Sequence, residues 1–124
     1  MEGMKMRTTT MSLEEIRYRA TKWAGKNAQV YDRGDYVEIA IDTHGLSVRE
    51  ALVYARNMIN LIRCPFKLSV IHGFHRGQAI MTALRTDFSS HWAKRIRQMT
   101  TDYWNPGVTH FLIDGDGYIQ AYAS

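Results

Sequence analysis

The sequence predicts an α/β fold of the α+β two-layer sandwich type, with a βαβαββ mixed sheet and an additional N-terminal helix. Two serine–glutamate pairs, in SLEE (12–15) and SVRE (47–50), have the form of helix capping boxes and precede apolar residues at helical spacing. Two apolar runs of strand length end at Ile41 and Ile71, on either side of the second of these helices. If the two strands share a sheet, a strand, a helix and a strand in this order form a parallel, right-handed unit.

Length and composition indicate one small globular domain. The chain has 124 residues, of which 45% are hydrophobic, so we expect a buried core rather than disorder. The only cysteine, Cys64, excludes an intrachain disulfide and fits a reducing compartment. No apolar segment reaches membrane-spanning length, and the N-terminal residues lack the apolar core of a secretion signal. We therefore expect a cytoplasmic protein with no membrane partner.

The pattern along the chain places each element. The expected elements are a flexible lead (1–11), a helix (12–27), a loop (31–36), a strand (35–41), a helix from Ser47 to Pro65, a strand (67–71), a helix (77–88), strands at 95–101 and 108–113, a turn (114–117) and a returning hairpin strand (118–122). Ser12 begins the first helix, and Pro65 ends the second. The strand at 67–71 is short and largely apolar, as in a sheet covered on both faces. We divide the chain into a lead with an N-terminal helix (1–34) and an α/β domain (35–124).

Both apolar strands end in a His-Gly pair that a helix pattern follows. Parallel strands bring their carboxyl ends to one edge, where open α/β sheets bind ligands, so we expect His44 and His72 to meet there. Asp42 and His75 would join them, beside helix N-termini and glycines that suit a phosphate. Imidazoles at such a site can transfer protons near neutral pH.

Other interpretations of these residues stay open. His-Gly can end a strand only because glycine turns the chain, and Asp42 can cap the loop backbone. Asp42 and His44, together with His72 and His75, can also chelate a metal ion. Trp92, Tyr103 and Trp104 can stack on nucleic-acid bases or pack in the core. His91 and His110 receive no role.

Positive charge favours an anionic partner. Sixteen Lys and Arg against twelve Asp and Glu give a net charge of +4. We expect five basic residues to form one surface beside the His-Gly edge: Arg76, Arg85, Lys94, Arg95 and Arg97. A solvated face with no partner is the alternative.

Three segments resemble the Smr (small MutS-related) domain family: IDTHGLSVREAL (41–52), SVIHGFHRG (69–77) and NPGVTHFLI (105–113). The family has a Leu-Asp-x-His-Gly motif after its first strand and a His-Gly-x-Gly motif after its second. The resemblance covers about residues 35–114. It implies a fold like the C-terminal domain of translation initiation factor three, together with DNA or RNA binding and often endonuclease activity.

Position by position, the resemblance implies roles for individual residues. The catalytic positions would be Asp42, His44 and His72, with Mg²⁺ or Mn²⁺ as a possible cofactor at Asp42 and His44. The nucleic-acid-binding positions within the two motifs would be Gly45, Gly73, His75 and Gly77. The basic residues expected beside them, from the distribution of charge, are Arg76, Arg85, Lys94, Arg95 and Arg97.

The second motif departs from the family. His75 stands where the family has a glycine, Phe74 where a basic residue is common, and Ile80 where an arginine is common. Arg76 is a better substitute for that arginine than Arg85, because five positions along an α-helix are a rotation of roughly 140°. The expected function is therefore a metal-assisted endonuclease, and the alternative is a DNA- or RNA-binding module without cleavage activity.

Overall fold

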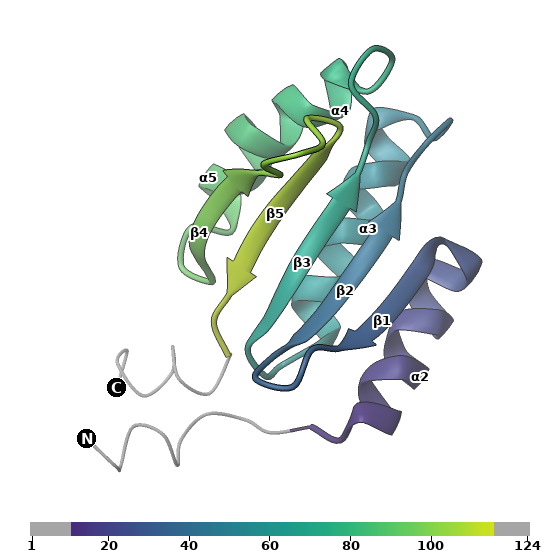
Figure 1. Cartoon of the computed structure of the whole chain (residues 1–124), viewed down its shortest axis with the longest axis vertical. Helices are drawn as coiled ribbons and strands as arrows, with labels where there is room; N and C mark the ends of the chain where they lie inside the picture. The colour runs from purple at the N-terminus through teal and green to yellow at the C-terminus, as the bar shows by residue number, and fades with distance from the viewer. Residues whose placement is uncertain (1–10, 116–124) are drawn as a thin grey trace.

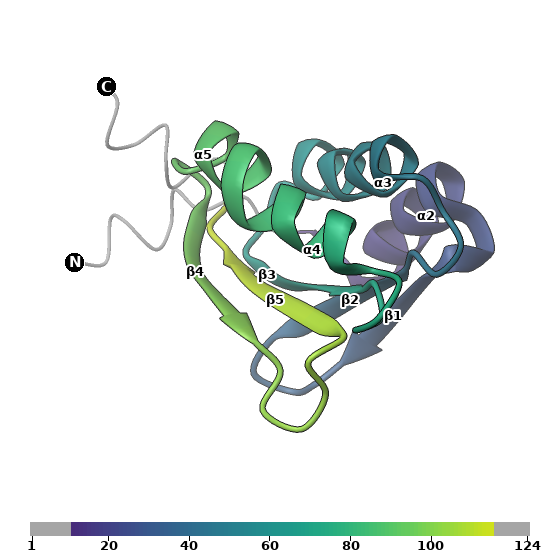
Figure 2. The same cartoon turned by 90° about the horizontal axis from the view of Figure 1, so that it is seen from above.

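A computed structural model of the chain, which describes residues 11–115, has one mixed sheet with helices along one face. Figure 1 views the sheet with the helices behind it, and Figure 2 shows the helices on one side and the opposite face uncovered. The elements in chain order are α2 (Leu13–Ala24), a 3-10 turn (Gly25–Asn27), β1 (Ala28–Asp32), β2 (Val37–Asp42), α3 (Val48–Leu61), β3 (Phe66–Ile71), α4 (Gln78–Ala83), a π-helical segment (Leu84–Phe88), α5 (Ser89–His91), β4 (Ile96–Thr101) and β5 (Val108–Ile113).

The five strands lie in the order β1-β2-β3-β5-β4. β2 and β3 are parallel, with Ile41 opposite Val70, and all other neighbouring pairs are antiparallel. The fold is therefore the expected two-layer sandwich with a mixed sheet. None of the helices within residues 11–115 combines the length and the apolar character needed to cross a bilayer.

Both capping boxes begin helices as the sequence predicts. The Ser12 hydroxyl accepts a hydrogen bond from the Glu15 amide at the start of α2. At the start of α3, the Ser47 hydroxyl accepts a hydrogen bond from the Glu50 amide, and the Glu50 carboxylate accepts one from the Ser47 amide. Each bond satisfies an amide that would otherwise lack a helical partner, so the local sequence fixes where these helices start.

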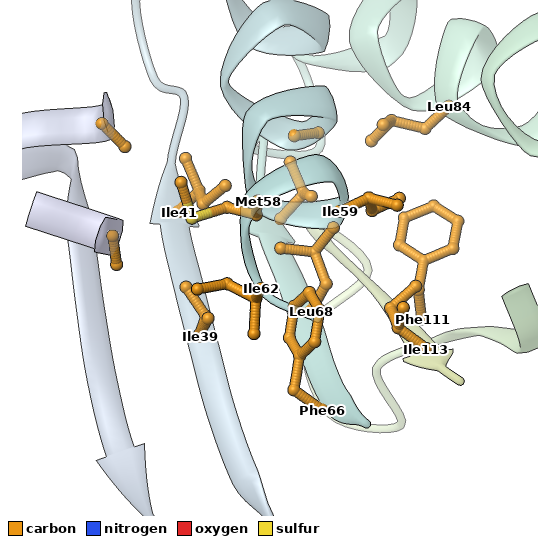
Figure 3. Close-up of a cluster of buried hydrophobic side chains, with 14 of the residues drawn as sticks. Ile39, Ile41, Met58, Ile59, Ile62, Phe66, Leu68, Leu84, Phe111 and Ile113 are labelled. Carbon is orange, nitrogen blue, oxygen red and sulfur yellow. The ribbon is translucent and has the colours of Figure 1, made fainter. Parts of the chain in front are cut away.

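One apolar layer holds the sheet and the helices together (Figure 3). Alternate side chains of the central strands point to the helices, among them Ile39, Leu68 and Phe111, and all three are fully buried. Met58 and Ile59 of α3 fill the space above them. Helix α2 adds buried residues to this core, although the prediction assigned it to a separate lead.

The first strand was missed. We predicted residues 31–36 as a loop, but Tyr31 and Asp32 end β1, which pairs antiparallel with β2 from Ala28↔Ile41 to Asp32↔Val37. The predicted division between residues 34 and 35 thus falls inside the β1–β2 hairpin. The remaining strands and helices up to residue 113 lie where the sequence placed them, within a few residues. The predicted strand at 118–122 and part of the predicted turn lie outside the described residues.

Arg95 is buried and stabilises the end of helix α3. Its guanidinium donates to the carbonyls of Ile59 and Ile62, and also to that of Asp114. Carbonyls in the last turn of a helix lack helical partners and carry partial negative charge, which suits a cation. The prediction that Arg95 contributes to an exposed basic surface is therefore wrong.

Replacing Arg95 tests this role. Arg95→Met keeps much of the apolar stem and removes the hydrogen bonds, so we expect the free energy of unfolding to fall by roughly 2–3 kcal/mol. Arg97→Met is the matched control, because Arg97 lies two residues further along, is exposed and pairs only with Asp114 among the ion pairs described. Its effect should stay within about 1 kcal/mol. Equal losses in urea denaturation would contradict the assignment.

Candidate functional site

The loops after β2 and β3 meet at the carboxyl edge of the sheet. The amide and the hydroxyl of Thr43 donate to the Ile71 carbonyl at 2.8 Å and 2.9 Å. Thr43 is fully buried, so this link joins the two loops at their base. The edge predicted for His44 and His72 is thereby formed.

Asp42 and His44 form an exposed hydrogen-bonded pair. Asp42 Oδ1 lies 2.9 Å from His44 Nδ1 and accepts the His44 amide at 3.0 Å. Their side chains are 57% and 62% exposed, so solvent and a ligand can reach them. A carboxylate can only accept, so Nδ1 carries the proton in this pair, and Nε2 of a neutral ring is left as a base.

The His44 ring lies over Gly73. A Cβ added at Gly73 would stand 2.9 Å from His44 Nε2, and Gly73 has a φ of +83°, which side chains rarely adopt. His44 Nε2 therefore sits against the backbone of the second His-Gly pair. Gly77 is required for a different reason, because a Cβ there would lie 1.8 Å from the His72 carbonyl oxygen.

A third loop joins the same point. The Gly107 carbonyl, between β4 and β5, accepts the amides of His72 and Gly73 at 2.9 Å each. A Cβ at Gly107 would lie 2.9 Å from the Gly73 backbone, so the two glycines are in close contact. The backbone of Gly73 is thus the place where the β2–α3, β3–α4 and β4–β5 loops converge.

His72 is a buried supporting residue. It is 2% exposed; its Nδ1 donates to the Gly73 carbonyl at 2.7 Å, and its Nε2 lies 2.9 Å from the Thr109 hydroxyl. Burial lowers the pKa of His72, the hydrogen bond to the Gly73 carbonyl opposes this, and the electrostatic effects of Arg85 and His44 add to the lowering. Neither ring nitrogen is free to meet a substrate, so we assign His72 to the support of the loop and not to proton transfer.

The predicted basic residues lie at two ends of the molecule. Arg76 is exposed in the loop before α4, and the Arg85 guanidinium reaches Thr101 Oγ1 and is close enough to affect His72. Arg97 and Lys94 instead lie near the start of β4. There Ile96 pairs with Ile113, which in turn pairs with the first residue of β3. The prediction of one basic surface is wrong for Arg95, which is buried, and Arg97 and Thr101 lie toward opposite ends of strand β4.

The other implied residues take simple positions. Gly45 lies in the β2–α3 loop with a φ of +77° and open space where a side chain would be. His75 is exposed, and its ring meets the Phe74 ring edge-on at 5.2 Å. Phe74 is itself 44% exposed.

Asp42 and His44 do not complete a metal site by themselves. Within residues 11–115 there is no group of three or more His, Cys, Asp or Glu side chains that could hold an ion. Asp42 Oδ1 and His44 Nδ1 are already joined to each other. An Mg²⁺ ion would need water and phosphate oxygens for most of its ligands. We therefore derive no chemical step through a metal.

Sequence reasoning missed a polar chain that crosses the sheet. The Ser69 hydroxyl donates to Glu38 at 2.6 Å and lies 2.7 Å from His110 Nδ1, while His110 Nε2 lies 2.7 Å from Asp102 Oδ1. Burial raises the pKa of Glu38, but hydrogen bonds from Ser69 and Arg33 outweigh it and leave that pKa lowered. The hydrogen bond from His110 lowers the pKa of Asp102.

Two of the three aromatic residues considered for base stacking are exposed. Tyr103 and Trp104, in the β4–β5 loop, are 85% and 86% exposed. The sequence offered no periodicity here to separate a packing residue from an exposed one. Trp92, the third aromatic residue considered, is partly buried against the core.

Comparisons of the chain with protein-family models and with curated protein sequences gave no match.

The buried imidazole of His72 predicts a loss of stability in mild acid. Its pKa lies below the ordinary 6.5, so the folded protein keeps the ring neutral while the unfolded chain takes up a proton. The stability that depends on the neutral ring is complete above pH 6.5 and decreases as the pH falls toward the folded-state pKa. Urea denaturation between about pH 7.5 and 5 measures this decrease. His72→Asn cannot titrate, and an equally steep decrease in that variant would contradict the explanation.

Proposed function

We propose that this protein binds nucleic acid at the edge formed by the three loops and hydrolyses a phosphodiester there, as an Smr-like endonuclease domain. The observation that carries the proposal is the Asp42–His44 pair, in which an exposed carboxylate orients an exposed imidazole at 2.9 Å. This arrangement is one that general-base catalysis uses. DNA and RNA both carry the required phosphodiester.

The pair suggests how a proton would move. Asp42 holds the proton on His44 Nδ1, and Nε2 takes a proton from the attacking hydroxyl or water as that oxygen bonds to phosphorus. The bond between phosphorus and the leaving oxygen then breaks, the leaving oxygen takes a proton from solvent water, and His44 Nε2 returns its extra proton to the solvent. Asp42 also stabilises the positive charge that forms on the ring, much as a carboxylate does in other histidine-based sites.

Phosphate binding would depend on the charges nearest this pair. Arg76 is exposed between His75 and Gly77, and Arg85 is held toward the same edge through Thr101. Gly73 has no side chain, so no Cβ fills the space beside His44 Nε2.

The motifs supply the reason for choosing this family. Ile41-Asp42-Thr43-His44-Gly45 is close to the first Smr motif, and the order of elements from β2 to β5 is the one that the family would require. His75 and Phe74 replace residues typical of the second motif, and they favour a binding module without cleavage as the second candidate. Cleavage and binding therefore have to be measured separately.

His44→Ala and Asp42→Asn should each lower the cleavage rate by about a hundredfold or more, the scale of a lost general acid–base group. Binding should change far less, because phosphate affinity depends mainly on the basic residues. Labelled single- and double-stranded DNA and RNA, each with Mg²⁺, Mn²⁺ or EDTA, provide the two measurements.

His91→Ala is the matched control for these variants. His91 is also an exposed histidine, but it lies on α5 against Trp92 and outside the three loops. Its removal should leave cleavage unchanged. Wild-type protein that binds but never cleaves would replace the nuclease with the binding module, and protein that does neither would end both proposals.

Two double variants with the same charge change test where phosphates bind. Arg76→Ala with Arg85→Ala should weaken binding and make its salt dependence shallower, by up to about two in the slope of log K against log salt. Lys94→Ala with Arg97→Ala removes two charges at the other end and should change neither. Equal effects of the two pairs in titrations at several salt concentrations would show that only the net charge matters.

A further inference from the structure

Tyr103 and Trp104 are the most exposed of the large hydrophobic side chains within residues 11–115. Their rings meet edge-on, with centroids 4.7 Å apart and planes at 87°. Burying one large aromatic side chain typically contributes a few kcal/mol, so two adjacent rings left in solvent favour a partner that covers them.

The loop that carries the two rings has a fixed backbone. Asp102 Oδ2 accepts the amides of Trp104 and Asn105 at 3.1 Å and 2.9 Å, and the Asn105 side chain accepts the Gly107 amide at 2.9 Å. Asp102 is in turn held by His110. A ligand would thus meet an ordered loop, and little entropy would be lost in forming it.

The β4–β5 loop also lies close to the Asp42–His44 pair. Gly107 contacts Gly73, over which the His44 ring lies, so one glycine connects the aromatic loop to the proposed base. Figure 2 shows the β4–β5 loop projecting beyond the strands on the side away from the helices. An extended ligand bound at His44 would therefore reach the β4–β5 loop.

The charge beside the loop indicates what kind of ligand would fit. Thr101, immediately before Asp102, is bonded by the Arg85 guanidinium, and Asp102 itself is occupied by His110 and the loop amides. Aromatic faces next to a fixed positive charge suit a strand of bases joined by phosphates. In a duplex the base faces are covered by their neighbours, whereas an unpaired base can stack on a protein ring.

We propose that Tyr103 and Trp104 form a stacking platform for unpaired bases, which makes single-stranded nucleic acid the preferred ligand. The proposal rests on the proposed function, since it names the substrate of the same edge. Loss of either ring should raise the dissociation constant for a single strand roughly 5- to 100-fold, which is the range measured for single stacked bases. Duplex binding should change little.

The test compares Tyr103→Ala and Trp104→Ala with two matched controls. Tyr18→Ala and Trp23→Ala remove exposed rings of the same kinds from helix α2, which are 64% and 46% exposed. The probes are labelled DNA and RNA strands of about 12 nucleotides and the duplexes made from them. Binding is measured by titration, and stacking by quenching of tryptophan emission, which should disappear in Trp104→Ala and persist in Trp23→Ala.

Each outcome bears on a different proposal. Tighter single-strand binding that is lost only in the two loop variants supports the platform, and a difference between the DNA and RNA arms identifies the natural strand. Equal binding of strands and duplexes, with the loop variants unchanged, overturns the platform and leaves the proposed function standing. Wild-type protein that binds none of the probes overturns both. Urea denaturation of the loop variants should match wild type, because the rings are exposed.

Discussion

The parallel pairing of β2 and β3 is the constraint on which the candidate site depends. Helix α3 connects the two strands across one face, so both carboxyl ends leave the sheet at one edge. Thr43 then bonds the Ile71 carbonyl twice and joins the two loops at their base. An antiparallel pair would have sent His44 and His72 to opposite ends. The same core that stabilises the domain therefore determines that these histidines meet.

The two histidines at this edge have different surroundings, which suit them to different roles. His72 lies against Thr109 and its own loop, without solvent, and burial favours its neutral form. His44 is exposed, with one nitrogen fixed by Asp42. Gly73 separates them, and its lack of a side chain lets the His44 ring lie on the loop that His72 supports. A single glycine thus allows one imidazole to be structural and the other to be available for chemistry.

The sequence predicted what depends on local signals and missed what depends on distant contacts. Ser47 and Glu50 bond each other three residues apart, so α3 could be recognised from its own residues. The strand Ala28–Asp32 has weak alternation and is stabilised by its partner β2, which explains why its last two residues were predicted as a loop and the rest received no assignment. Arg95 resembles its exposed neighbours in sequence, and only the approach of α3 makes it a buried helix cap. The exposure of Tyr103 and Trp104 likewise depends on where the sheet ends.

The uncovered face of the sheet carries a row of hydrogen-bonded side chains that leads to the β4–β5 loop. Because Leu68 and Val70 face the helices, Ser69 between them faces the other way, and so does His110 between Thr109 and Phe111. The bonds from Glu38 through Ser69 and His110 to Asp102 cross three strands and end at the aromatic loop. The helix-covered face positions His44 through β2 and β3, while the open face positions Tyr103 and Trp104 through the same strands. A change in sheet register would therefore move the Asp42–His44 pair and the two aromatic side chains together. Under the proposed function, changes confined to Tyr103 and Trp104 or to Asp42 and His44 would separate ligand binding from chemistry.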